Sequence, residues 1–151
     1  MLKTLSYPTD IKLLNQAREQ TEKILDRLYE QVKDKFDRKP RTYRQKARKD
    51  YLAISKQRRP RHKKRRRAIG KQLAYLRRNL SHIDTLLTIG ANLSQLKPQS
   101  YRMLLVVHEL LRQQQLMYDS RTCGQALCRR IDDRIVSLTQ PHVRPIVRGK
   151  A

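Results

Sequence analysis

The sequence predicts a mainly α-helical protein with long helices and an extended C-terminal tail, and three observations support this. Apolar residues recur at helical spacing in four stretches that together cover most of residues 10–118. One of these stretches keeps a regular heptad spacing over six apolar residues. Beyond Tyr118 helical spacing ends, and the last residues contain Pro141 and Pro145, which favour extended backbone.

The first predicted helix starts at Tyr7-Pro-Thr-Asp10 and runs to about Phe36. Pro8 disfavours helix at Tyr7, and Thr9 or Asp10 can cap the free N–H groups that follow. The predicted apolar face consists of Ile11, Leu14, Thr21, Leu25, Leu28 and Val32. The opposite face mixes charges and is expected in solvent; it consists of Glu19, Glu22, Lys23, Asp26, Arg27, Glu30 and Lys33.

The second and third helices are predicted to form a basic antiparallel hairpin over residues 38–90. The second resumes after Pro40 with Tyr43, Ala47, Tyr51 and Ile54 at helical spacing, and Pro60 ends or kinks it. The third carries an apolar stripe with steps of 4, 3, 4, 3 and 4 residues, formed by Ile69, Leu73, Leu76, Leu80, Ile83 and Leu87. Gly90 is a natural stop. This stripe must be covered, either by the first and fourth helices or by a second copy of the chain.

A fourth helix is expected after Lys97-Pro98. Its predicted apolar side contains Tyr101, Leu104, Leu105, His108, Leu111 and Leu116 or Met117, with His108 expected in the core. The predicted organisation is a helical region over 1–118, a loop over 119–130 and an extended tail over 131–151. Within the tail, Arg134-Ile-Val-Ser-Leu-Thr139 has the composition of a strand.

Positive charge is concentrated in one region of the chain. The formal net charge is +23, and +18 of it lies between Arg38 and Arg78, where nineteen Lys and Arg residues accompany one acid, Asp50. Residues 1–37 are neutral overall, and residues 79–151 carry +5. Like charges packed this closely oppose a compact state unless an anion neutralises them, so the pattern indicates a localised surface for a polyanion such as nucleic acid.

The candidate nucleic-acid-binding residues are the cations of this segment. In its densest part, residues 58–67, eight of ten residues are basic. At the start of the third helix these cations face the positive end of the helix dipole, so they are expected to order best against phosphate. The set is Arg44, Lys46, Arg48, Lys49, Lys56, Arg58, Arg59, Arg61, Lys63, Lys64, Arg65, Arg66, Arg67 and Lys71.

Composition excludes several other classes of site. No apolar run is long enough for a bilayer, so no membrane partner is expected, and residues 1–6 lack the apolar region of a signal peptide. The two cysteines, Cys123 and Cys128, make no disulfide framework, and a spacing of five positions without a second Cys/His pair is a weak zinc signal. We therefore expect no metal in this chain and a reducing, cytoplasmic location.

Three blocks of sequence resemble the DDE-type transposases of bacterial insertion sequences. The blocks are Tyr7-Pro-Thr-Asp10 with Leu13-Leu-Asn-Gln-Ala-Arg18; Lys39-Pro-Arg-Thr-Tyr-Arg-Gln-Lys-Ala-Arg-Lys-Asp-Tyr51 with Lys56-Gln-Arg-Arg-Pro60; and Asp132-Asp-Arg-Ile-Val-Ser137 with Gln140-Pro-His-Val-Arg-Pro-Ile-Val-Arg-Gly-Lys-Ala151. They occur in order and span nearly the whole chain. The loop Thr122-Cys-Gly-Gln-Ala-Leu-Cys128 departs from the family pattern.

The resemblance implies DNA transposition and recombination, with an RNase H-like sheet whose three carboxylates hold Mg²⁺ in the full-length family. This chain is similar to the helical, basic stretch between the first and second of those acids, and its extended tail would be left over from the sheet. None of the three acids falls on a position of this chain, so no catalytic residue is assigned and a truncated, catalytically incomplete transposase is expected. DNA, through its phosphates, and other transposase copies would be the partners, and a DNA-bound protein would be associated with the bacterial nucleoid.

Two alternatives stay open on sequence alone: a non-catalytic RNA-binding module, and a helical interaction protein that associates through Leu73, Leu76 and Leu80. Stacking platforms made of aromatic residues would favour RNA. Tyr43, Tyr51 and Tyr75 fall instead at the spacing of a helical core. Asp132 and Asp133 could form a cryptic metal site only if their carboxylates converged, and adjacent residues on a strand point to opposite sides.

Overall fold

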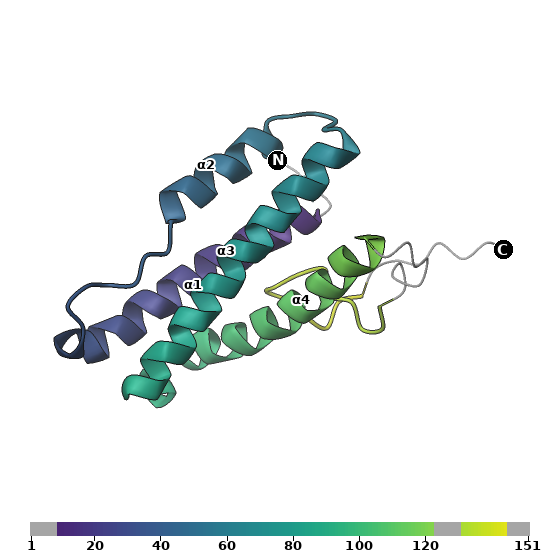
Figure 1. Cartoon of the computed structure of the whole chain (residues 1–151). Helices are drawn as coiled ribbons and strands as arrows, with labels where there is room; N and C mark the ends of the chain where they lie inside the picture. Colours follow the sequence, from purple (N-terminus) through teal and green to yellow (C-terminus); the bar gives the residue numbers. More distant parts are fainter. Residues whose placement is uncertain (1–8, 123–130, 145–151) are drawn as a thin grey trace, which may run out of the picture.

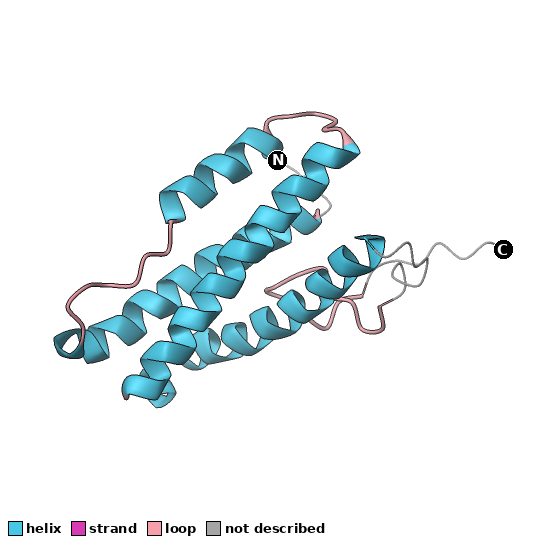
Figure 2. Cartoon of the chain, viewed as in Figure 1, coloured by secondary structure: helices cyan, strands magenta, loops and turns pink. Residues whose placement is uncertain are grey.

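The computed structural model describes residues 9–122 and 131–144, which contain four α-helices joined by short connections (Figure 1). The helices are α1 (Asp10–Val32), α2 (Arg44–Ser55), α3 (His62–Ile89) and α4 (Pro98–Thr122). Short 3₁₀ turns follow α1 at Lys33–Lys35 and precede α4 at Leu93–Gln95. The described part of the chain contains no strand (Figure 2), and the mainly α class is confirmed.

Helices α1 and α3 form the centre of the fold and run side by side in the same direction (Figure 1). Their contacts advance together along both helices, from Arg18 with Gln72 to Thr21 with Asn79. Helix α4 returns antiparallel to this pair, and the shorter α2 packs antiparallel against α3. The predicted hairpin of the second and third helices is therefore confirmed.

The start and the buried face of α1 follow from local sequence. Thr9 is the N-cap, and its Oγ1 accepts a hydrogen bond from the backbone N–H of Lys12 at 3.4 Å. Leu14, Leu25 and Leu28 are fully buried, as expected. Glu22 is buried as well, so its predicted place in solvent is wrong. A buried arginine, Arg18, binds the carboxylate and compensates for its burial.

The apolar stripe of α3 is covered within the chain. Ile69, Leu73, Leu76, Leu80 and Ile83 are all buried, Leu87 is partly buried, and they share one core cluster with residues of α1 and α4. The helix ends at Gly90, whose φ of +129° is strained for any residue with a Cβ. The N–H of Ala91 then bonds the Leu86 carbonyl at 3.0 Å, which satisfies one free acceptor at the helix end.

Gly70 has a packing role that the helical pattern does not reveal. A Cβ built at this position would lie 2.7 Å from the Tyr118 hydroxyl oxygen of α4. The close approach of the Tyr118 side chain to α3 therefore requires glycine, which explains an otherwise unfavourable residue inside a long helix.

Helix α4 differs from the prediction at its end and in its buried face. It continues to Thr122, so the loop predicted from residue 119 is wrong for 119–122. In this last turn the Ser120 hydroxyl donates a hydrogen bond to the Leu116 carbonyl at 2.8 Å. The buried apolar positions are Leu104, Val107, Leu110 and Met117, so Leu104 is buried as expected and Met117 is the buried member of the predicted pair Leu116 or Met117. The expected core residues Tyr101, Leu105 and His108 are exposed.

The C-terminal segment is irregular where a strand was predicted at residues 134–139. Its backbone groups pair with a side chain instead of a neighbouring strand. Gln113 of α4 donates to the Asp133 carbonyl at 3.1 Å and accepts from the Ile135 N–H at 2.9 Å. Ile135 and Leu138 then enter the core cluster. Cys123 and Cys128 lie outside the described residues, as does the tail beyond residue 144.

Removing one buried leucine of the α3 stripe should destabilise the whole fold. Leu76 is 0% and Leu80 4% exposed, and Leu→Ala at such sites costs about 2–5 kcal/mol of unfolding free energy. We expect Leu76→Ala and Leu80→Ala to lower the melting temperature strongly in circular dichroism, and Arg77→Ala, at an exposed position between them, to change it little. The melting temperature should also be independent of protein concentration, because the stripe is covered within one chain. Equal effects of the three substitutions would contradict this packing.

Candidate nucleic-acid interface

The basic hairpin, defined as α2, the connection 56–61 and α3 up to Lys71, is tied to α1 at its start. Asp26 of α1 accepts two hydrogen bonds from the Arg44 guanidinium, at 2.8 and 3.0 Å, and pairs with Lys39 at 2.6 Å. Burial alone would raise the pKa of Asp26, but the bonds from Arg44 and Lys39 outweigh burial and lower it. Arg44 therefore fixes the start of α2, and its cation is already compensated.

Tyr43 precedes α2 in a left-handed conformation, with φ of 52°. This is unusual for a residue with a Cβ and requires support from neighbours. Support comes from α3, because the Arg78 guanidinium lies 4.6 Å from the centre of the Tyr43 ring. The ring is 45% exposed, so Tyr43 is not the core residue of α2 that its spacing predicted.

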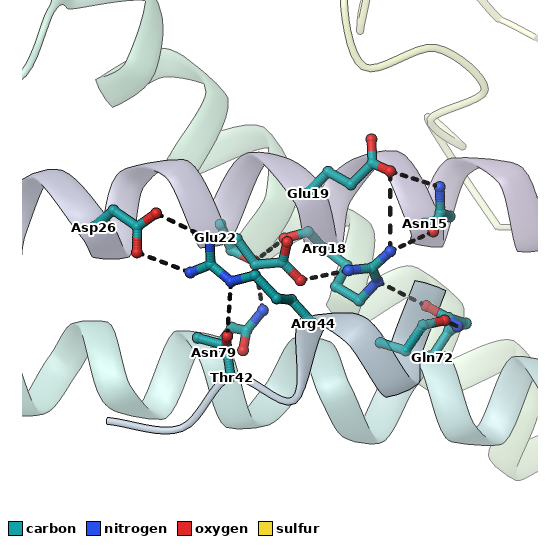
Figure 3. Close-up of polar contacts among 11 residues, drawn as sticks. Asn15, Arg18, Glu19, Glu22, Asp26, Thr42, Arg44, Gln72 and Asn79 are labelled. Atoms are coloured by element: carbon teal, nitrogen blue, oxygen red, sulfur yellow. Dashed lines mark hydrogen bonds and ion pairs between the residues drawn. The ribbon is translucent and has the colours of Figure 1, made fainter. Parts of the chain in front are cut away.

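A buried polar network joins the hairpin to α1 (Figure 3). The Arg18 guanidinium, 1% exposed, donates to Gln72 of α3 at 3.2 Å, to Asn15 at 2.6 Å and to Glu22. Gln72 in turn donates to the Ala47 carbonyl of α2 at 3.2 Å. Burial raises the pKa of Glu22, and the charge and hydrogen bond of Arg18 oppose that shift. This chain of contacts links three helices at one point.

Asp50, the single acid of the basic segment, is used inside the hairpin. It accepts a hydrogen bond from the Tyr75 hydroxyl at 2.7 Å and pairs with Lys71 at 3.6 Å. Burial, followed by the bond and charge of Asp50, raises the pKa of Tyr75 to about 12, so Tyr75 remains a protonated donor at neutral pH. Asp50 is therefore engaged by α3 and does not neutralise the other cations around it.

The first turn of α3 concentrates positive potential. Its N-cap is Arg61, with no side-chain cap for the free N–H groups, and the first turn contains no acid. Unsatisfied N–H groups and the helix dipole place partial positive charge here, and Lys63, Lys64 and Arg65 add full charges. Such an arrangement favours an anion.

The predicted candidates divide into two groups in the structure. Arg44 and Lys71 pair with carboxylates, and Arg66 packs against α4, where it donates to the Tyr118 carbonyl at 3.0 Å and lies 4.1 Å from the centre of the Tyr118 ring. The other eleven are exposed and pair with no carboxylate of the described residues. These eleven, called the free cations below, are Lys46, Arg48, Lys49, Lys56, Arg58, Arg59, Arg61, Lys63, Lys64, Arg65 and Arg67.

Part of this surface is a shallow groove between α2 and α3. The free cations Lys64 and Arg67 line it from α3, and Lys71 continues the row beside its partner Asp50 of α2. Over these positions the helix rises by about 10 Å. Successive phosphates of one DNA strand advance by about 3.4 Å along the duplex axis. The length of α3 between Lys64 and Lys71 therefore matches the advance of about three nucleotides.

The described residues contain no group of three or more His, Cys, Asp or Glu side chains placed to hold a metal ion. Asp132 and Asp133 are exposed, and Asp133 pairs with Arg144 at 3.2 Å. Within residues 9–122 and 131–144, no helix combines the length and apolar character that a membrane crossing requires.

Sequence reasoning missed the residues that position the hairpin, although one signal was available. The predicted stripe of α1 contains Leu14 and then Thr21, and the position between them that continues the helical spacing is Arg18. An arginine at a core position of an amphipathic helix indicates a buried ion pair. Gln72 and Asn79, both buried, occupy comparable positions seven residues apart on α3.

No family model, curated protein or solved structure matches this chain. Its function is therefore inferred from the arrangement of its own residues.

Replacing Arg18 should lower the free energy of unfolding far more than replacing an exposed residue of α1 does. Arg18→Met removes the cation that compensates the buried Glu22, and breaking such a pair typically costs about 3–5 kcal/mol. The double variant Arg18→Met, Glu22→Leu removes both charges, so urea unfolding should show that it regains most of this loss. Lys23→Met, at an exposed position of the same helix, is the control. A double variant as unstable as Arg18→Met would contradict the assigned role of the pair.

Proposed function

We propose that this chain binds DNA through the phosphate backbone, with the basic hairpin as the contact element. The observation that carries the proposal is the group of eleven free cations, which no described carboxylate neutralises. A hairpin with this charge repels itself, and phosphate is the abundant cellular partner that relieves the repulsion.

The hairpin is suited to phosphates because it is held in place before binding. At the start of the hairpin Arg44 donates to Asp26 of α1, and in its middle Gln72 donates to the Ala47 carbonyl. On the α3 side, Arg66 donates to the Tyr118 carbonyl of α4. The free cations therefore project from a fixed backbone, which reduces the ordering that binding would require. Arg and Lys that meet phosphate oxygens set affinity and position without reading sequence, so little sequence preference is expected.

The wider role we propose is that of the helical, DNA-contacting part of a DDE-type transposase in the bacterial cytoplasm. This rests on the three sequence blocks that resemble the family, one of which, residues 39–60, enters the hairpin. The metal-binding carboxylates of such enzymes have no counterpart in this chain. DNA contact, rather than strand cleavage, is therefore the activity proposed for it.

Binding should weaken steeply with salt. If about six phosphates are engaged, log K falls against log salt concentration with a slope of roughly −5, because each contact releases condensed counterions. Fluorescence anisotropy with unrelated duplexes should give similar slopes and similar affinities. An affinity that is insensitive to salt, or the absence of binding at low salt, would contradict the proposal.

A matched pair of variants locates the contact. Lys63, Lys64 and Arg67 are free cations of α3, and their triple replacement by Gln should weaken binding on every duplex and reduce the salt slope by about 3. The control replaces Lys23, Lys97 and Arg102, which are exposed outside the basic segment, with Gln. The control removes the same charge, so equal losses in both variants would indicate attraction by net charge rather than contact by the hairpin.

The isolated chain should not cut DNA. We expect no cleavage of transposon-end DNA with Mg²⁺ or Mn²⁺, because two-metal chemistry needs convergent carboxylates and the exposed Asp132 and Asp133 are accompanied by no third ligand in the described residues. Gel analysis of labelled DNA is the measurement. Metal-dependent cleavage that disappears in Asp132→Asn or Asp133→Asn would overturn this assignment.

A further inference from the structure

A second feature beside the basic hairpin is a cleft of about 560 Å³. It lies where the start of α1, the end of α2 and the first turns of α3 meet, and Arg134 of the C-terminal segment contributes to its wall. Sites for small ligands typically have volumes of about 300–1,000 Å³. The cleft is therefore large enough for one nucleotide.

The walls of the cleft combine two kinds of surface. Ile11, Tyr51, Ile54 and Ile69 supply apolar area from three different helices. Arg58, Arg65 and Arg134 supply cations, together with Lys12. Among the described residues of the lining Asp10 is the one acid, and it pairs with Arg134 at 2.7 Å. A ligand that fits both surfaces has a flat or apolar part and an anionic part.

Arg134 adds an observation of its own. One of its terminal nitrogens binds Asp10, and its Nε is buried without a hydrogen-bond partner in the described residues. The Arg134 side chain as a whole is 30% exposed, so the buried Nε is its one unsatisfied atom in the described residues, and unsatisfied buried donors are rare in folded proteins. A guanidinium held beside a cleft by one carboxylate is suited to an additional anion.

We propose that this cleft binds one nucleotide unit, with the base against Tyr51 and the isoleucines and the phosphate near Arg58, Arg65 and Arg134. The proposal rests on the proposed function, since Arg58 and Arg65 are also free cations of the hairpin. It goes beyond phosphate contact, because a base paired and stacked inside a duplex does not reach an apolar cleft. The ligand is therefore an unpaired nucleotide of a strand or a free nucleotide.

The test compares a blunt duplex with the same duplex carrying a short single-stranded extension, by anisotropy at fixed salt. Stacking of a base on an aromatic side chain predicts about fivefold or greater preference for the extension. Arg134→Gln and Ile11→Glu should abolish this preference, and Arg144→Gln, an exposed arginine outside the cleft, should retain it. Ile11 packs partly against the core, so circular dichroism must show that Ile11→Glu keeps the helix content of the wild type, and Arg134→Gln, outside the helices, is the second variant.

A calorimetric titration with deoxyadenosine monophosphate distinguishes the two sources of the nucleotide and does not depend on duplex binding. If the wild type binds deoxyadenosine monophosphate saturably, loses this binding in Arg134→Gln and shows no preference for the extension, the cleft is assigned to free nucleotides. Preference for the extension that Arg134→Gln and Ile11→Glu both remove assigns it to unpaired strands. If the wild type shows neither, the inference is overturned, whereas salt-dependent binding to the blunt duplex would still support the proposed function.

Discussion

Repulsion among the basic residues is the constraint that shapes the structure, and the packing of α3 along α1 opposes it. Nineteen cations and one acid share residues 38–78, so repulsion between like charges in this segment outweighs its internal ion pair, Lys71 with Asp50. The apolar stripe of α3 is buried against α1 and α4, and this burial extends to Ile69, next to the most basic turns. Apolar packing at one end of α3 thus holds the charged end in place.

The buried polar contacts fix how α1, α2 and α3 are aligned relative to one another within this packing. The Arg18 network joins α1, α2 and α3 at one level, and Asp26 fixes the entry into α2. A buried ion pair contributes little net stability compared with apolar residues of the same shape, because desolvation offsets the attraction. The buried pair instead fixes how the three helices pack, since few other arrangements of them would satisfy the Arg18 guanidinium. The acid that neutralises Arg44 lies on α1, and the free cations at the tip of the hairpin, within residues 56–67, have no carboxylate partner in the described residues.

The regular elements could be predicted because their signals are local. The Thr9 cap, the stripe of α3 and the stop at Gly90 each follow from a few neighbouring residues, and the exposed position of most candidate cations follows from charge. The errors arose where tertiary partners decide the outcome. Glu22 is buried because Arg18 binds it. Where a strand was predicted, the backbone at Asp133 and Ile135 binds the Gln113 side chain, and α4 buries Val107 and Leu110 instead of the predicted Leu105 and His108. Contact between the candidate cations and DNA stays a prediction.

The central claim is that a hairpin fixed before binding presents its tip to DNA. Amide hydrogen exchange of the free and DNA-bound chain measures this directly, because it reports both the order of α2 and α3 in the free state and the segment that the ligand protects. We predict protection of α2 and strong protection of α3 from about Ile69 onward without DNA, and new protection centred on residues 44–71 with DNA. New protection on α4 instead, or a hairpin that is unprotected until DNA is added, would contradict the account.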